Sequence, residues 1–338
     1  MRTPFDRRRF LAVLAGSAGW AAGATGCRNG PAKPDPRTKA AERSPQRCTV
    51  LDTHTHFYDP TRPEGVPWPP RDDALLYRTV MPEHYLALPV PQAVTGTVVV
   101  EASPWIEDNQ WVLDLAARAP FILGLVGNLP VGSAEFAAHL DRFARNPRFR
   151  GIRIRDRKLE GALEEANFVS DLRRLAAHDL SLDLVGGLEI LSFAERLARD
   201  VPDLRVVLDH LAGVRVDGNA PPADWERQVR AVVRHPNIYA KLSGLVEGTG
   251  RTDGAAARDV AFYRPVLDVM WEAFGPQRLV YGSNWPVSER FAPLATVQGI
   301  VQDYAREKGQ KAELAVMAEN ARTAYGLAGP PGARNPPS

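Results

Sequence analysis

The chain has 338 residues, of which 44% are hydrophobic and 24% are charged, the usage of an ordinary globular protein. Its formal net charge is +2, but the first 27 residues carry four arginines and one aspartate, leaving 38 basic and 39 acidic residues in the rest. Because that remainder is not basic, the composition excludes a protein that binds nucleic acid through a broad positive surface.

The N-terminus has the pattern of an export signal. Arg7-Arg8-Arg9-Phe10-Leu11 matches the twin-arginine form Arg-Arg-x-Phe-Leu, and an apolar run follows from Leu11 to Thr25. A basic start before a short apolar run is typical of a signal peptide and too short for a stable membrane span. We therefore expect residues 1–27 to be a twin-arginine signal peptide and the mature protein to be periplasmic.

Cys27 follows Ala24-Thr25-Gly26, a run similar to a lipoprotein processing site. Cleavage there would leave a lipid-carrying N-terminus at Cys27, and with it a membrane-anchored lipoprotein; plain cleavage near Ala22 or Ala24 is the alternative. The second cysteine is Cys48, so no disulfide framework or cysteine-based metal site is expected in the folded region.

Two segments have the composition of flexible chain. Residues 28–47 and 329–338 are rich in proline and nearly free of large apolar side chains, so they cannot bury enough surface to offset the entropy of ordering. The folded domain is therefore predicted to span residues 48–328.

Within that domain, short β-rich runs alternate with amphipathic stretches. The predicted strands are Thr49–Thr53, Thr95–Val100, Phe121–Val126, Gly151–Arg155, Leu180–Leu184, Leu204–Leu208, Ile238–Leu242 and Leu279–Gly282. The predicted helices are Asn109–Ala119, Ala134–Asn146, Val169–His178, Ile190–Asp200, Trp225–His235, Phe262–Phe274 and Leu294–Lys308. Eight such strands alternating with helices predict an α/β protein with a single-domain (β/α)8 TIM barrel. An open doubly wound sheet is the alternative, and no glycine-rich dinucleotide fingerprint follows any strand.

Two connections are long. Phe57 to Ala93 contains eight prolines and follows the first strand, which would place it over the mouth of the barrel as a lid or wall. Ser243 to Ala256 is rich in glycine and is predicted to be a mobile loop after the seventh strand.

The end of the first strand carries the strongest chemical signal, Asp52-Thr53-His54-Thr55-His56. Side chains alternate across a strand, so Asp52, His54 and His56 are expected to point the same way. Two imidazoles at this spacing can converge on one metal ion or one water molecule.

Polar residues also follow other apolar strands, where catalytic groups of such barrels lie. Several together at one rim indicate a convergent polar site. The candidates are Glu101, Arg153, His210, Lys241 and Asn284, with Arg155 and Asp209 expected to form ion pairs around them. Trp68, Trp105 and Trp285 lie in predicted mouth loops, where their rings could stack on a sugar-like ring or simply anchor the loops.

The motifs in order resemble the amidohydrolase-related TIM-barrel hydrolases, and within them the branch of sugar-lactone and pyrone-dicarboxylate lactonases. The resemblance runs from Leu51 to Tyr325. It is carried by Asp52–His56, Phe57–Arg62 with Trp68-Pro69, Gly151–Arg153, Leu208–His210, Lys241–Gly244 and Gly282–Pro286.

This resemblance implies a role for several residues. His54 and His56 correspond to the metal-binding or water-orienting pair, His210 to the strand-six histidine and Arg153 to a residue that binds anions or hydroxyls. The fifth strand, residues 181–185, has no histidine, so one divalent cation rather than two is expected. Its ligands would be His54, His56, Glu101 and His210, with zinc the favoured metal and metal-free catalysis the alternative.

Asn284 departs from the family, which usually has an aspartate there to take a proton from water. A carboxamide is neutral and cannot act as a general base. Glu101 is the expected replacement, with His210 and Asp52 as further candidates.

The resemblance implies hydrolysis of a small-molecule lactone, a cyclic ester of a sugar or small carboxylic acid. Arg153 or Lys241 would stabilise the developing oxyanion, and Trp68 and Trp105 would contact the substrate. A non-oxidative decarboxylase on the same barrel is one alternative. A ligand-binding barrel without activity is the other, and Asn284 motivates it.

Overall fold

The computed structural model describes residues 49–155, 159 and 161–327. The predicted signal peptide, the linker 28–47, the tail 329–338 and both cysteines lie outside these residues, so those assignments stay predictions. In the part that is described, no helix has both the length and the apolar character needed to cross a membrane.

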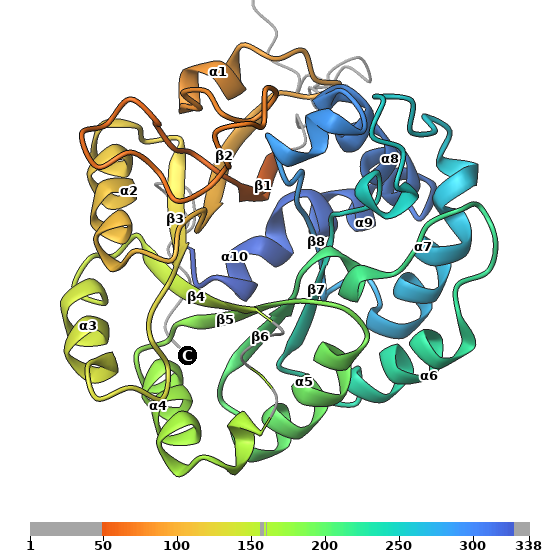
Figure 1. Cartoon of the computed structure of the whole chain (residues 1–338). Coiled ribbons are helices and arrows are strands. Elements are labelled where there is room, and N and C mark those ends of the chain that lie inside the picture. The colour runs from red at the N-terminus through yellow and green to blue at the C-terminus, as the bar shows by residue number, and fades with distance from the viewer. Residues whose placement is uncertain (1–48, 156–158, 160, 328–338) are drawn as a thin grey trace, which may run out of the picture. The chain divides into compact units, whose positions relative to one another are not determined.

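Eight parallel strands form one sheet in chain order, and the sheet closes into a barrel (Figure 1). The strands are β1 (Val50–Thr55), β2 (Val94–Val100), β3 (Ile122–Gly127), β4 (Phe149–Arg155), β5 (Ser181–Val185), β6 (Arg205–Leu208), β7 (Ile238–Leu242) and β8 (Leu279–Tyr281). Closure occurs just beyond β8. There Thr55 forms a parallel bridge with Trp285, and the backbone N–H of Asn284 donates to the His54 carbonyl at 2.8 Å. The TIM-barrel prediction is confirmed, and the open-sheet alternative is excluded.

Seven longer helices surround the barrel, one after each strand from β2 onward (Figure 1). They are α2 (Ile106–Arg118), α3 (Phe136–Phe143), α4 (Ala166–Ala177), α5 (Glu189–Asp200), α6 (Ala223–Val232), α7 (Val260–Phe274) and α8 (Leu294–Glu307). Each buries one apolar stripe, as α5 does through Ile190, Ala194 and Leu197 at helical spacing. All seven begin and end within three residues of the predicted bounds, because this periodicity is a strong local signal.

After α8 a helical segment crosses one opening of the barrel, drawn in blue at the centre of Figure 1. It consists of α9 (Gln310–Leu314), the π-helix η6 (Ala315–Glu319) and α10 (Asn320–Ala324). Asn320 donates to the carbonyl of Leu279 at the start of β8, and Ala321 and Tyr325 pack with interior residues such as Val207. The amino ends of the strands are therefore covered, which leaves the carboxyl ends for a site.

The two long loops contain short elements of their own. The loop from Phe57 to Ala93 includes a bridge between Tyr58 and Val80 and the helix α1 (Pro82–Leu86). The remaining 3-10 turns are η2 (Ala162–Glu164), η3 (His210–Gly213), η4 (Glu247–Thr249) and η5 (Val287–Arg290). Of these, η3 and η4 follow β6 and β7 and carry residues of the site described below.

Candidate active site

Three histidines gather at the carboxyl end of the barrel. The His54 ring centroid lies 5.0 Å from that of His56 and 4.4 Å from that of His210. His54 and His56 come from the end of β1, and His210 comes from the turn after β6. The sequence placed all three at strand ends, and the structure brings them together.

His54 is fully buried among charged groups. Its Nδ1 lies 3.1 Å from the Lys241 ammonium, and its Nε2 lies 3.4 Å from the Arg153 guanidinium. Burial, followed by the charge of Lys241, holds the pKa of His54 well below its usual 6.5. The ring is therefore neutral near pH 7, the form that binds a metal or accepts a hydrogen bond.

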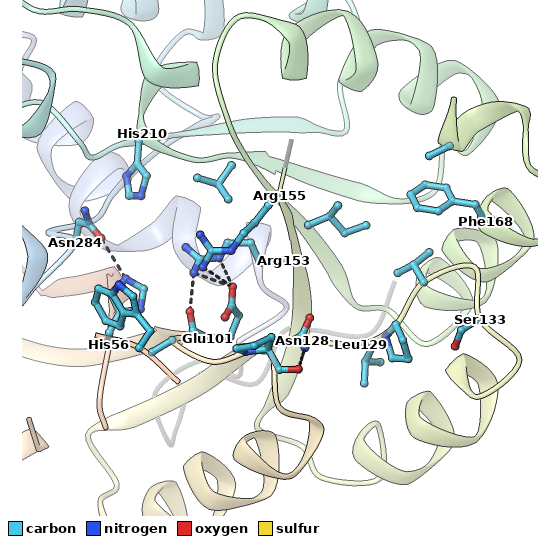
Figure 2. Close-up of a pocket in the computed structure, with 18 of the residues that line it drawn as sticks. His56, Glu101, Asn128, Leu129, Ser133, Arg153, Arg155, Phe168, His210 and Asn284 are labelled. Atoms are coloured by element: carbon cyan, nitrogen blue, oxygen red, sulfur yellow. Dashed lines mark hydrogen bonds and ion pairs between the residues drawn. The ribbon is translucent and has the colours of Figure 1, made fainter. Parts of the chain in front are cut away.

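His56 has one tautomer fixed by its surroundings. Its Nδ1 is 2.9 Å from the Val100 carbonyl, which can only accept, so Nδ1 carries the proton and donates. Its Nε2 lies 3.2 Å from Asn284 Oδ1 (Figure 2), and because Nε2 of this tautomer carries no proton, the contact places two hydrogen-bond acceptors side by side. The ring meets Trp68 edge to face at 5.8 Å. Burial, then the charge of Arg153, lowers the pKa of His56 to about 3.

His210 begins the turn η3 with a positive φ of 51°. Its Nδ1 lies 2.9 Å from the Ser243 hydroxyl at the end of β7. Gly244, at φ +71°, is required here, because a Cβ at that position would lie 2.6 Å from the His210 Cβ. Burial lowers the pKa of His210 to about 4, so this imidazole is also neutral near pH 7.

Glu101, Arg153 and Arg155 form a charged group beside the histidines, here called the open cluster (Figure 2). Arg153 donates from Nε to Glu101 Oε1 at 2.8 Å and from Nη2 to the Glu101 carbonyl at 2.6 Å, and Arg155 reaches the same Oε1 at 3.1 Å. Glu101 thus anchors two cations. Both guanidiniums reach Oε1, and Glu101 is not among the described residues close enough to share a metal ion, so its expected role as general base through Oε2 stays a prediction.

Lys241, Asp183 and Asp209 form a second charged group, the sealed cluster. The Lys241 ammonium lies 2.6 Å from Asp183 and 2.9 Å from Asp209, and all three side chains have no exposed surface. Tyr325 from the terminal helical segment donates a hydrogen bond to Asp183 at 3.0 Å. The expectation that Lys241 contacts substrate is therefore corrected: its stem points into the barrel, beneath the histidines.

A cavity of about 760 Å³ opens above the histidines. Its polar wall is formed by His56, Glu101, Arg153, His210 and Asn284, and Trp68 from the long loop after β1 covers it. Figure 2 shows Phe168 and Leu129 on the opposite side, where the wall is mostly apolar. Such a shape, apolar with a few convergent polar groups, suits an organic substrate.

The other two tryptophans do not line this cavity. Trp285 is 1% exposed and donates from Nε1 to Glu289, so it belongs to the core below the mouth. Trp105 is 41% exposed and borders a separate surface groove with Glu107 and Trp111. Trp285 thus takes the anchoring role that the sequence left open, the expectation that Trp105 contacts substrate finds no support in this cavity, and Trp68 is a cavity residue.

His54, Asp209 and His210 are the described residues whose ligand atoms lie close enough to hold one metal ion, within 4.8 Å of one another. Asp209 was expected only as an ion-pair partner. Both its oxygens lack a well-aligned hydrogen bond, although Lys241 is near, and the two imidazoles are neutral. This donor set fits a divalent cation such as Zn²⁺. The charge of Lys241, which holds the pKa of Asp209 low against the opposing effect of burial, weakens that binding.

Asp52 positions the end of β1 rather than facing the cavity. The pairing of β1 with β2 has an irregular register between Asp52 and Thr55, so the simple alternation expected for this strand is interrupted. The Asp52 carboxylate accepts from the Tyr85 hydroxyl at 2.7 Å and from the amides of His54 and Ser283 at 3.0 and 2.9 Å. It ties β1 to the loop after β8.

Glu247 is a residue that the sequence reading missed. It lies in η4, within the glycine-rich loop after β7, and its Oε1 accepts a hydrogen bond from Asn284 Nδ2 at 2.9 Å. Burial raises the pKa of Glu247 to about 7. A carboxylate six positions after Lys241 was the available signal, but an acidic residue in a loop is usually solvated and rarely identified in advance.

Comparison with known proteins agrees with this geometry. The sequence profile of the amidohydrolase family matches residues 51–327. The L-fucono-1,5-lactonase of Burkholderia ambifaria is 32% identical over 240 residues, which are 70% of this chain and 80% of that protein. The L-fucono-1,5-lactonase of Burkholderia multivorans is 28% identical over 84% of this chain and 98% of that protein.

A solved structure shares the fold. The zinc-bound crystal structure of an amidohydrolase from Burkholderia multivorans superposes with a TM-score of 0.72 at 25% identity. The match covers 83% of this chain and all of that one. The similarity thus extends over the whole barrel and includes the strand ends that carry the site.

Proposed function

Because this chain belongs to the amidohydrolase family, it is a hydrolase, and we propose that it opens the lactone ring of a sugar or a small carboxylic acid. The relatives named as lactonases match across most of the barrel, which supports this substrate class. The observation that carries the proposal is the convergence of three neutral imidazoles, of which His56 and His210 line the cavity together with the Arg153 guanidinium.

Lactone hydrolysis needs a water molecule directed at the ester carbonyl and a cation near the oxygen that becomes negative. Arg153 supplies a fixed positive charge at the cavity wall, held by Glu101 so that it does not reorganise during the reaction. A cation on His54, Asp209 and His210 would polarise the carbonyl or lower the pKa of a bound water.

The proton balance uses groups of this chain. Water adds to the carbonyl carbon and gives up one proton, the ring C–O bond breaks, and the alcohol oxygen that leaves takes up one proton, so the two transfers balance. The neutral imidazoles of His56 and His210 line the cavity and can accept a hydrogen bond from the water. Asn284 has no basic group and serves by orienting it.

A panel of sugar and aliphatic lactones, followed by acid release with a pH indicator, tests the proposal. We expect turnover of at least one lactone, and we expect His54→Asn and His56→Asn each to lower kcat/KM by about 10²-fold or more. The matched control is His178→Asn, a partly exposed histidine on the outside of the barrel. Full activity in both active-site variants, or no turnover of any lactone, would contradict the proposed function.

We also propose zinc as the metal. The support is the donor set of two imidazoles and a carboxylate and the zinc found in the related structure. Elemental analysis of purified protein should give about one equivalent per chain, and Asp209→Asn should reduce that amount. Metal content unchanged by that variant would place the ion elsewhere.

For the N-terminus we propose export by the twin-arginine route and a lipid anchor at Cys27. The support is the sequence Arg7-Arg8-Arg9-Phe10-Leu11 and the run before Cys27. Replacing Arg7-Arg8-Arg9 by lysines should leave the protein in the cytoplasm of an expressing bacterium, and Cys27→Ala should release it from the membrane fraction. Retained export or retained membrane association would refute the corresponding part.

A further inference from the structure

Asn284 bridges two groups at the edge of the cavity. Its Oδ1 lies 3.2 Å from His56 Nε2, and its Nδ2 donates to Glu247 Oε1 at 2.9 Å. Figure 2 shows the Asn284 amide oxygen pointing toward His56. The backbone of Asn284 is held as well, with φ at 58°, a conformation that asparagine tolerates, and its N–H donating to the His54 carbonyl. The side-chain amide group of Asn284 can still rotate by 180° about its Cβ–Cγ bond, which exchanges the positions of Oδ1 and Nδ2.

The Glu247 carboxyl has few other interactions. Its Oε2 is buried without a hydrogen-bond partner, and no ion pair of the described residues includes it. Tyr263 on α7, whose hydroxyl donates to the Ala257 carbonyl, lies close enough to feel the charges of Glu247 and of Arg251 in the same loop. Asn284 is therefore the side chain to which Glu247 is coupled.

The protonation of Glu247 decides which end of the amide faces the cavity. A carboxylate can only accept, so it takes the Nδ2 end of Asn284 and turns Oδ1 toward His56 and the cavity. A neutral carboxyl can donate, and it then favours Oδ1 on its own side and Nδ2 toward His56. The two states thus present opposite groups, an acceptor or a donor, to a water in the cavity.

This inference rests on the proposed function. We propose that Glu247 is a positioning residue that, as a carboxylate, holds Asn284 with its Oδ1 toward the cavity. There Oδ1 and the unprotonated Nε2 of His56 form a pair of acceptors for the two hydrogens of the attacking water. In this chain the Glu247 carboxylate thus acts on the water indirectly, through its hydrogen bond to Asn284. Asn284 transmits its effect by orientation, without taking the proton.

The arrangement makes activity depend on pH in a stated direction. Burial raises the pKa of Glu247 to about 7, so the carboxylate form is present above that pH and lost below it. Because the carboxylate form presents the acceptor, kcat/KM should rise as the pH increases through about 7. A group that merely stabilised the loop would leave no such step.

The test is the pH profile of lactone hydrolysis by the wild-type protein, Glu247→Gln and Asp253→Asn. Asp253 is the matched control, since it is an exposed carboxylate in the same loop and bonds only the local amide of Ala255. We expect Glu247→Gln to lower kcat/KM by roughly 10–100-fold at pH 8, the cost of a mispositioned group, and to abolish the step near pH 7. Asp253→Asn should retain both the rate and the step.

Glu247→Asp keeps the proposal falsifiable if Glu247→Gln folds poorly, and Asn284→Asp tests the same coupling from the other partner. Glu247→Asp should keep a pH step with a reduced rate. Asn284→Asp places a carboxylate directly at the cavity, and in that background Glu247→Gln should change the rate by less than about 3-fold, the limit for uncoupled positions. A wild-type step preserved in Glu247→Gln, or a full loss of rate in the double variant, overturns the role of Glu247.

A readout without substrate separates this proposal from the proposed function. The side-chain amide ¹⁵N signal of Asn284, assigned by its absence in Asn284→Ala, should shift with pH near 7 in the wild-type protein and stay constant in Glu247→Gln. If no lactone is hydrolysed but this shift is seen, the substrate assignment fails and the coupling stands. A signal that does not titrate refutes the coupling whatever the substrate.

Discussion

The open cluster and the sealed cluster both pair basic with acidic side chains, Arg with Glu in one and Lys with Asp in the other, yet they occupy opposite environments. Arg153 and Glu101 border a cavity of about 760 Å³, whereas Lys241, Asp183 and Asp209 have no exposed surface. In both, the charged side chains lie within apolar strands or directly after them. The two clusters differ in depth along the barrel axis. The sealed cluster lies deeper, since it also contacts Tyr325 next to α10 at the amino ends of the strands. Paired charges near strand ends therefore do not by themselves identify substrate contacts.

Removing the central cation of the sealed cluster, Lys241, is the strongest test of whether that cluster stabilises the fold. Lys241→Met leaves Asp183 and Asp209 buried without their counter-ion, so we expect a loss of about 3–5 kcal/mol in the free energy of unfolding. Urea denaturation followed by circular dichroism measures it. Arg264→Met is the control, because its ion pair with Glu307 lies at the surface. A variant as stable as the wild-type protein would show that the cluster is not a structural unit.

The open cluster should respond in activity rather than in stability. Arg153→Lys keeps the charge but loses the fork that holds Glu101, so kcat/KM should fall by about 10²-fold. Arg155→Lys, at a side chain that is 56% exposed, should cost only a few-fold. Lactone kinetics together with melting temperatures separate the two effects. Equal losses in both variants would mean that the guanidinium of Arg153 is not aimed at the substrate.

The neutral histidines couple the site to stability at acidic pH. The folded-state pKa of His210 is about 4, below the ordinary 6.5, so the unfolded chain binds the proton first as the pH falls. Stability contributed by the neutral ring is present above about pH 6.5 and is lost between about 6.5 and 4. We expect the melting temperature to fall over this range, measured with a chelator present.

His210→Asn tests that assignment, because it should show a shallower fall, while His178→Asn should follow the wild-type protein. An unchanged pH dependence in His210→Asn would mean that this ring is solvated.

Much of the fold could be predicted from the sequence because its signals are local. Apolar runs predicted the strands to within two residues, and the pair His54 and His56 indicated the correct end of the barrel. What could not be predicted depends on depth and on loops. Nothing local distinguishes buried Lys241 from cavity-lining Arg153, and Glu247 meets Asn284 only because a loop folds back over a distance of 37 positions.

The smallest expected effect concerns the aromatic residues of the mouth, where the same contrast between enclosed and exposed positions recurs. Trp68 covers the cavity and contacts His56, whereas Trp105 is 41% exposed on a separate groove. Trp68→Leu should raise KM by about 2–10-fold with little change in kcat, since one aromatic contact contributes about 0.5–1.5 kcal/mol. Trp105→Leu should change neither constant. If Trp105→Leu raised KM and Trp68→Leu did not, the substrate would have to enter over α2, and the cavity would not be the binding site.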